Sequence, residues 1–214
     1  MKDHIMLKLF GMIGVCVSLI IILFGGIKNP SNFRLISDII QNTLISIFML
    51  FLFFPDNKKI RDAIYLGTFV MVFDFILESI AVKFDWWYSL GGTTFPPIII
   101  VPLEMIVGFF FLGFSFYFIF DIPVYLVKIR SNYSLIKFFT NLAKKKPIPH
   151  IFRITIVFLN AIIGTNGDLT AGEEIWKMGP GWAPIYTFFI WLIGGLITLS
   201  FYYFLQNKKT KIEP

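Results

Sequence analysis

The sequence predicts an all-α polytopic membrane protein that forms one integral membrane domain over residues 1–214. The 214 residues are 57% hydrophobic and 15% charged, whereas soluble domains carry roughly 25% charged residues. The mean hydropathy of the chain is +0.77. Apolar runs of about 20 residues, the length that a helix needs to cross a bilayer, recur along the whole chain. These observations leave little sequence for a soluble domain.

Six apolar runs are predicted to be transmembrane helices, and turn-forming residues separate them. Asn29-Pro30-Ser31-Asn32 ends the first run, and Pro55-Asp56-Asn57 ends the second. Pro97 opens the fourth, because a proline at a helix start loses no intrahelical hydrogen bond. Asp121-Ile122-Pro123 is predicted to end that helix. Asn166-Gly167-Asp168 and Gly179-Pro180-Gly181 are predicted to form two turns in a loop over residues 165–182. The predicted spans are residues 6–27, 36–54, 63–82, 97–120, 151–164 and 184–205.

The basic residues predict the orientation of these spans. Of the 19 Lys and Arg residues, 15 fall on the side of the two termini, which includes the basic loop of residues 128–150. Because cytoplasmic loops carry the excess of Lys and Arg, both termini are expected in the cytoplasm of a multi-pass cell-membrane protein. We interpret Lys144-Lys145-Lys146 as part of this topology signal; a lipid site or a nucleic-acid site is the alternative. Membrane lipid is the expected partner of the chain. A nucleic-acid partner is not expected, and the oligomeric state is left open.

Three acidic residues lie inside predicted spans: Asp74 and Glu78 in the third and Glu104 in the fourth. A carboxylate at the centre of a bilayer costs at least ~2.5–3.5 kcal/mol, so such residues indicate a functional site. At ~1.5 Å per residue, all three lie about 6–12 Å from the outer end of their spans. Asn160 falls in the outer half of the fifth span and is expected to be a substrate-binding residue. Asp74 and Glu78 are four residues apart and share a helix face with Gly67, so this stripe is predicted to face the bundle interior.

The three acids suggest proton chemistry. Asp74 and Glu78, one turn apart in an apolar setting, cannot both ionise at low cost, so one is expected to be a neutral acid that can donate a proton. With Glu104 on a facing helix, the group suits general acid–base catalysis. Two alternatives remain open. The acids could form the proton relay of a carrier, or they could hydrogen-bond polar groups or Lys83 and simply hold the helices together.

An aromatic cluster, Trp86-Trp87-Tyr88, links the third and fourth spans. Aromatic residues commonly anchor helices at membrane interfaces, and this is the first interpretation. The second is substrate binding, because the faces of the rings would stabilise a cationic intermediate. The single cysteine, Cys16, and the two histidines lie away from the acids, so neither a metal site nor a cofactor is expected.

The order of these motifs is informative. An aspartate late in a span, Asp74, is followed by Trp86-Trp87-Tyr88, by Gly91-Gly92 and by Pro102-Leu103-Glu104 at the start of the next span. In this order the stretch resembles the lycopene cyclase domain of small integral-membrane carotenoid cyclases and the related carotenoid hydratases. Their motif carries a second glutamate where this sequence has Met105.

The resemblance implies a redox-neutral reaction in the membrane. A carboxylic acid protonates the end group of a polyene, and the resulting carbocation cyclises or takes up water. Glu104 is then the first choice for the proton donor, with Asp74 or Glu78 as its partner. The expected function is an isoprenoid- or carotenoid-modifying enzyme of the cyclase or hydratase type that needs no cofactor. The alternatives are a proton-coupled membrane carrier and a non-enzymatic membrane scaffold.

Overall fold

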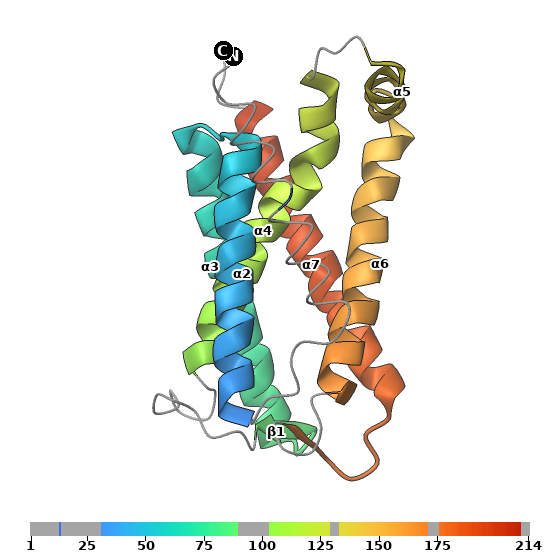
Figure 1. Cartoon of the computed structure of the whole chain (residues 1–214). Helices are drawn as coiled ribbons and strands as arrows, with labels where there is room; N and C mark the ends of the chain where they lie inside the picture. The colour runs from blue at the N-terminus through green and yellow to red at the C-terminus, as the bar shows by residue number, and fades with distance from the viewer. Residues whose placement is uncertain (1–12, 14–30, 90–102, 129–132, 171–175, 211–214) are drawn as a thin grey trace.

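The apolar runs form long helices that lie side by side (Figure 1). This computed structural model describes residue 13 and residues 31–89, 103–128, 133–170 and 176–210. Helices account for most of these residues, and two strands of three residues each account for a few more. The all-α prediction is thereby confirmed for the described part of the chain. The elements are α2 (Ser31–Phe53), α3 (Asn57–Lys83), β1 (Trp87–Ser89), α4 (Leu103–Lys128), α5 (Ser134–Ala143), α6 (Pro147–Thr170), β2 (Trp176–Met178) and α7 (Pro184–Thr210).

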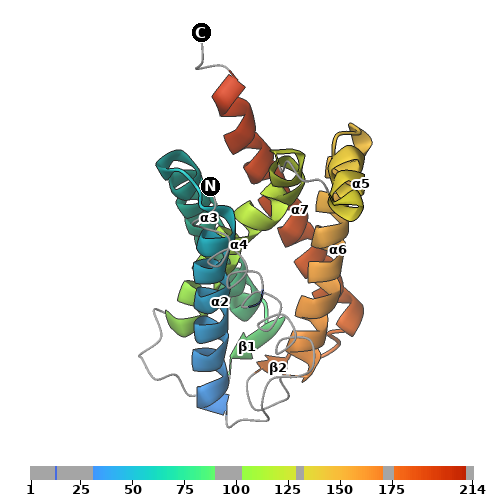
Figure 2. The ribbon, with the colours of Figure 1, turned by 45° about the horizontal axis from the view of Figure 1, so that its top comes forward.

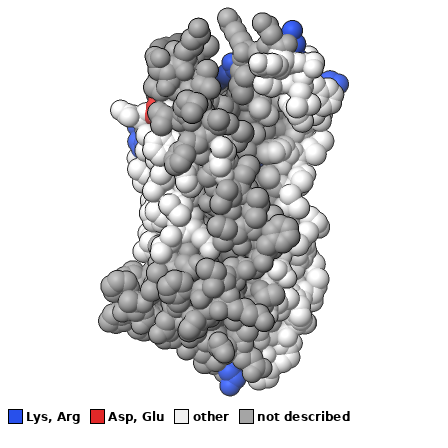
Figure 3. Space-filling model, viewed as in Figure 1, with Lys and Arg blue, Asp and Glu red and all other residues white. Residues whose placement is uncertain are grey.

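Four of the described helices are long and apolar enough to cross a membrane, namely α3, α4, α6 and α7. The corresponding part of α2, Ile40–Phe53, is apolar but shorter. In Figure 3, the Lys, Arg, Asp and Glu residues described on that face lie toward the two ends, and the described surface between them is uncharged. The predicted first span, residues 6–27, lies outside the described residues except for Ile13, and so do residues 97–102 of the predicted fourth span.

The predicted end of the fourth span at Asp121-Ile122-Pro123 is wrong. Helix α4 continues through Pro123 and ends at Lys128. A proline inside a transmembrane helix is tolerated where neighbouring side chains bind the backbone groups that it disturbs. Here the carbonyl oxygen of Phe120, in the turn before Pro123, accepts a hydrogen bond of 2.9 Å from Nε of Arg153.

The fifth predicted span, residues 151–164, is too short. Helix α6 begins at Pro147, because proline is well suited to the first position of a helix, and it continues to Thr170. Asn166-Gly167-Asp168 is therefore helical and does not form the predicted turn. Contacts with α7 favour the extension, since Trp191 of α7 donates a hydrogen bond to Asp168. The second predicted turn, Gly179-Pro180-Gly181, is confirmed, and Gly181 adopts a positive φ of 78°.

Helix α4 packs against α2 and α3, while α6 pairs with α7. The close approach of α3 to α4 depends on Gly67, because a Cβ there would lie 2.7 Å from the backbone oxygen of Phe110. Gly67, Asp74, Glu78 and Ala81 are all buried on one face of α3, so the predicted inward stripe is confirmed. Small residues allow such close packing in lipid, where no hydrophobic force drives helices together.

The two ends of the bundle differ (Figures 1 and 2). One end carries β1 and β2, which pair in antiparallel fashion with Trp87 opposite Met178. The other end carries α5, the connection between α2 and α3, and the last turns of α4 and α7. We call these the strand end and the α5 end. The buried acids of α3 lie toward the strand end, since Glu78 is five residues before the last residue of that helix.

Candidate functional site

Two buried carboxyl groups on α3 form the base of the candidate site. The side chain of Asp74 is 4% exposed and that of Glu78 is 7% exposed. They lie one turn apart on the face of α3 that is directed into the bundle, as their spacing of four residues requires. Apart from Ser79, whose hydroxyl donates to the carbonyl of Phe75, helix α3 is otherwise apolar over this stretch, so these two groups interrupt a hydrophobic interior.

Trp87 orients the carboxyl group of Glu78. Its indole Nε1 donates a hydrogen bond of 2.7 Å to Oε2 of Glu78. The chain reverses sharply after α3 to bring Trp87 back: Asp85 has a positive φ of 54°, and the amide of Trp86 donates to the carbonyl of Ala81 at 2.9 Å. This tight turn brings the indole of Trp87, itself only 8% exposed, within hydrogen-bonding distance of Glu78.

The loop before α7 packs against this turn and is hydrogen-bonded to it. The amide of Gly179 donates a hydrogen bond of 2.8 Å to the carbonyl of Trp86. A Cβ at Gly179 would lie 1.7 Å from the backbone oxygen of Asp85, so only glycine fits there. The rings of Trp86, Trp87 and Trp182 contact one another with centroid distances of 5.1 to 6.2 Å. Aromatic pairs at such distances stabilise packing beyond the area that they bury.

A third acid, Asp168, approaches from α6. The indole Nε1 of Trp191 donates a hydrogen bond of 2.7 Å to Oδ2 of Asp168. Gly164, one turn earlier, leaves room for the ring of Trp191, which also stacks on Phe109 of α4 at 5.8 Å. Asp168 lies near enough to Asp74 and Glu78 for an electrostatic interaction with both. Three carboxyl groups from two helices thus form one acid cluster, which we define as Asp74, Glu78 and Asp168.

Asp74 differs from the other two acids in its hydrogen bonding. Its Oδ2 is buried and has no hydrogen-bond partner among the described residues, whereas one oxygen of Glu78 and one of Asp168 each accept from an indole. A buried polar atom without a partner costs about 1–3 kcal/mol, and native proteins retain few of them. The free oxygen of Asp74 is therefore the group that is best able to bind something else.

The structure brings together some of the predicted site residues and not others. Asp74, Glu78 and Trp87 are in one place, and Trp86 lies beside Trp87. Asn160 is half-buried on α6, two turns before Asp168, and no hydrogen bond between described groups links it to the acids. Glu104 lies in the first turn of α4 and Tyr88 in β1, but both side chains fall outside the described part of the structure.

Asp168, Trp182 and Trp191 are the residues that sequence reasoning misses. Asp168 falls in a predicted turn, so its helical position and its depth are not evident from the local pattern. The signal that points to it is the run of acid and tryptophan residues between Asp168 and Trp182, which repeats the order of Asp74 and Trp86. No group of three or more His, Cys, Asp or Glu side chains in the described ranges is arranged to hold a metal ion.

A second polar cluster lies at the α5 end, where sequence reasoning finds only topology signals and a helix end. Asp121 of α4 pairs with Lys59 of α3 and accepts a hydrogen bond of 3.0 Å from the hydroxyl of Tyr202 on α7. Arg153 of α6 donates toward the hydroxyls of Tyr202 and Tyr203, each at 3.4 Å. We call these five residues the ion network. Its charges are matched by hydrogen bonds or an opposite charge, so it is suited to joining helices.

Comparison of the chain with models of known protein families, with curated proteins and with solved structures finds no match. The resemblance to the lycopene cyclase domain therefore stays a prediction, and the acid cluster has to be interpreted from its own geometry.

Proposed function

We propose that the acid cluster is the proton-donating site of a membrane enzyme that acts on a hydrophobic, isoprenoid-type polyene. The observation that carries the proposal is Oδ2 of Asp74, a buried carboxyl oxygen without a hydrogen-bond partner among the described residues, beside two further acids. Asp74 and Glu78 are buried and Asp168 beside them is half-buried. Desolvation of the two buried groups and mutual repulsion both disfavour the ionisation of all three, so the cluster is suited to retaining at least one transferable proton.

The proposed chemistry is redox-neutral. Asp74 donates its proton to an alkene carbon of the end group, which forms a new C–H bond and leaves a carbocation. The cation is then attacked by a neighbouring double bond, and a carboxylate of the cluster removes a proton to give the cyclic product. In the hydratase variant, water adds to the cation and loses its proton to the same base. In acid–base catalysis, two carboxyl groups in unlike environments often act one as the acid and the other as the base.

Asp74 replaces Glu104 as the preferred proton donor on this proposal, because its free oxygen can be seen in the described part of the chain. Glu104, in the first turn of α4, remains a candidate for the partner. Trp86, Trp87 and Trp182 supply aromatic faces beside the acids, which suits a positively charged intermediate. Trp87 also orients Glu78 through its indole hydrogen bond.

Product analysis tests the proposed function. The chain is expressed in a bacterial host that accumulates lycopene, and the pigments are separated by chromatography with mass detection. We expect a new pigment of unchanged mass for cyclisation, or of a mass increased by one water for hydration, and we expect Asp74→Asn to abolish it. Asp62→Asn is the matched control, because Asp62 is a buried aspartate of the same helix near the α5 end.

Unchanged pigment, with the protein present in the membrane, would contradict the proposed substrate. Full product formation by Asp74→Asn would contradict the proposed donor. A proton flux in vesicles that depends on Asp74, in the absence of any product, would favour the carrier.

We further propose that the α5 end faces the cytoplasm of a cell-membrane protein, with both termini on that side and the acid cluster toward the outer surface. The charge distribution supports this orientation, because Lys59, Arg61 and the basic residues near α5 lie at one end, whereas Lys83 and Lys177 lie at the other. An excess of Lys and Arg marks the cytoplasmic side.

Cysteine labelling tests the orientation. In a Cys16→Ala background, Lys177→Cys is expected to react with a membrane-impermeant maleimide in intact cells. Lys144→Cys is expected to react only after the cells are permeabilised. Both lysines are exposed, so burial in the protein does not bias the comparison. The reverse pattern would overturn the proposed orientation.

A further inference from the structure

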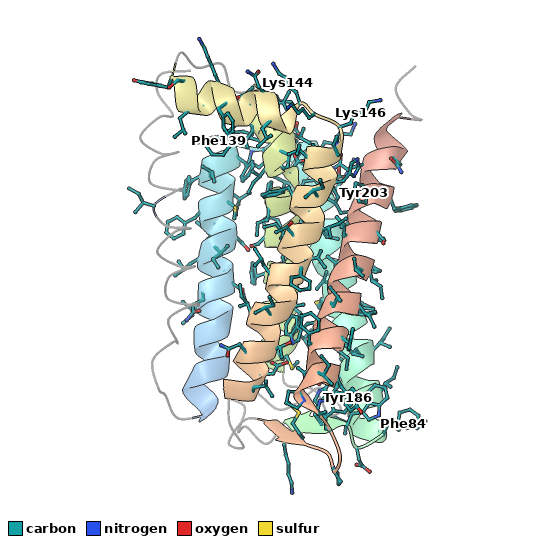
Figure 4. All side chains as sticks on the ribbon, turned by 90° about the vertical axis from the view of Figure 1, so that its right-hand side faces the viewer. Phe84, Phe139, Lys144, Lys146, Tyr186 and Tyr203 are labelled. Carbon is teal, nitrogen blue, oxygen red and sulfur yellow. The ribbon has the colours of Figure 1, made fainter. Side chains whose placement is uncertain are left out.

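Helix α5 is unlike the other helices in length, direction and composition. It has 10 residues and lies across the end of the bundle, whereas the neighbouring helices α4 and α6 run along it (Figures 1 and 4). It connects the end of α4 to the start of α6, and the hydroxyl of Thr140 ties it to α4 through a hydrogen bond of 3.3 Å to the carbonyl of Leu126. If α4 and α6 span a bilayer, α5 lies parallel to the membrane surface.

The sequence of α5 divides its surface into three faces. Ile136, Thr140 and Ala143 are spaced by four and three residues, and these side chains are half-buried or buried against the bundle. Leu135 and Phe138, with Phe139 beside them, form a second face; Leu135 is 67% and Phe138 is 60% exposed. An exposed apolar face on an amphipathic helix is typical of helices that lie in a membrane interface.

The helices on either side of α5 also expose apolar side chains near this end of the bundle. Val124 and Val127 near the end of α4 are exposed, and so are Ile151 and Ile154 in the first turns of α6. These helices are of membrane-spanning length and composition, so their exposed apolar side chains suit contact with lipid. A bilayer around these side chains of α4 and α6 also reaches the second face of α5. Lipid is therefore favoured over a soluble protein partner as the contact of this face.

The third face and the residues around it are basic. Lys137 lies on α5, and Lys144, Lys145 and Lys146 follow it directly; all four are exposed. Figure 4 shows Lys144 and Lys146 at the end of the bundle. Phe139 lies on the side of α5 that is closer to the middle of the bundle (Figure 4). No Asp or Glu occurs in the sequence between Asp121 and Asp168. The positive charge of this segment is thus not balanced locally.

A cavity of about 240 Å³ that is open to the surface lies between α5 and the adjoining ends of α4 and α6. Five of its lining residues are apolar and the sixth is a lysine, a composition that suits an acyl chain next to an anionic group. The lining residues are Pro123, Val124, Val127, Lys128, Ala143 and Pro149.

We propose that α5, the lysines after it and this cavity form a binding site for an anionic phospholipid of the membrane. The apolar face of α5 lies among acyl chains, an acyl segment enters the cavity, and the lysines contact the phosphate group. The site lies at the opposite end of the bundle from the acid cluster and is independent of its function. Each lysine near an anionic membrane surface strengthens binding by roughly fivefold, so Lys144, Lys145 and Lys146 together account for most of the selectivity.

Lipid retention by the full chain tests this site. The protein is purified in detergent, supplied with equal amounts of phosphatidylglycerol and phosphatidylcholine of the same chain length, and analysed by native mass spectrometry. We expect preferential retention of phosphatidylglycerol. The variant Lys144→Gln/Lys145→Gln/Lys146→Gln is expected to lower this preference at least tenfold, because most of the positive charge beside the cavity is removed.

Two further variants complete the test. Lys208→Gln/Lys209→Gln/Lys211→Gln removes the same charge from the C-terminal segment and is expected to retain the preference. Phe138→Ser/Phe139→Ser is expected to reduce the retention of both lipids without changing their ratio. Equal retention of the two lipids by the unmodified chain, or an equal loss of preference in the two lysine variants, would overturn the proposed site. Unchanged retention by the phenylalanine variant would do the same.

Discussion

Replacing Arg153 by leucine is expected to lower the free energy of unfolding by about 3 kcal/mol. The side chain of Arg153 is only 6% exposed, and its Nε donates to the carbonyl of Phe120 at 2.9 Å. The guanidinium also lies over the rings of Tyr202 and Tyr203, at 5.2 and 5.4 Å from their centroids. Its loss removes this donor from the carbonyl of Phe120 and from the hydroxyl of Tyr202 next to Asp121.

Arg61→Leu is the matched control for this prediction. Arg61 is at the same end of the bundle, but its side chain is 58% exposed and its Nε is 3.9 Å from Asp62. Exposed ion pairs contribute about 0–1 kcal/mol, so this change is expected to have little effect. The two variants are compared by unfolding the protein in mixed micelles with a denaturing detergent and following tryptophan fluorescence. Similar small losses in both would show that the ion network does not hold the helices together.

Replacing Asp74 by asparagine is expected to lower activity without lowering stability. The product formation proposed above should fall by about 10²–10⁴-fold, the usual contribution of a general acid. The free energy of unfolding should be equal to or higher than that of the unmodified chain, because asparagine cannot ionise at a buried position where Oδ2 of Asp74 has no hydrogen-bond partner among the described residues. Active-site residues often carry such a cost in stability.

Glu78→Gln separates this interpretation from a structural one. Glu78 accepts a hydrogen bond from Trp87, so its replacement weakens a contact that is already made and is expected to cost about 1 kcal/mol of stability. The same denaturation measurement serves for both variants. If Asp74→Asn were destabilised as much as Glu78→Gln, Asp74 would be a packing residue, and the scaffold alternative would be favoured.

The helical spans follow from local properties of the chain. Helix α3 matches its predicted span within six residues at the start and one at the end, because an apolar run bounded by Pro55 and Asp85 leaves few other options in a membrane. The inward stripe of Gly67, Asp74 and Glu78 is equally local, since residues three and four apart on a helix must share a face. Length, hydropathy and helix periodicity are sufficient for these predictions.

Contacts between distant residues decide the rest. Asp168 joins Asp74 and Glu78 because α6 extends past its turn-forming residues, and the extension is favoured by Trp191, 23 residues further along the chain. Helix α4 continues through Pro123, while Arg153 of α6 binds the carbonyl of Phe120 one turn earlier. Neither partner is evident from a local window of sequence. In a membrane, buried polar groups must find partners within the protein, and the packing of helices determines which partners come within reach.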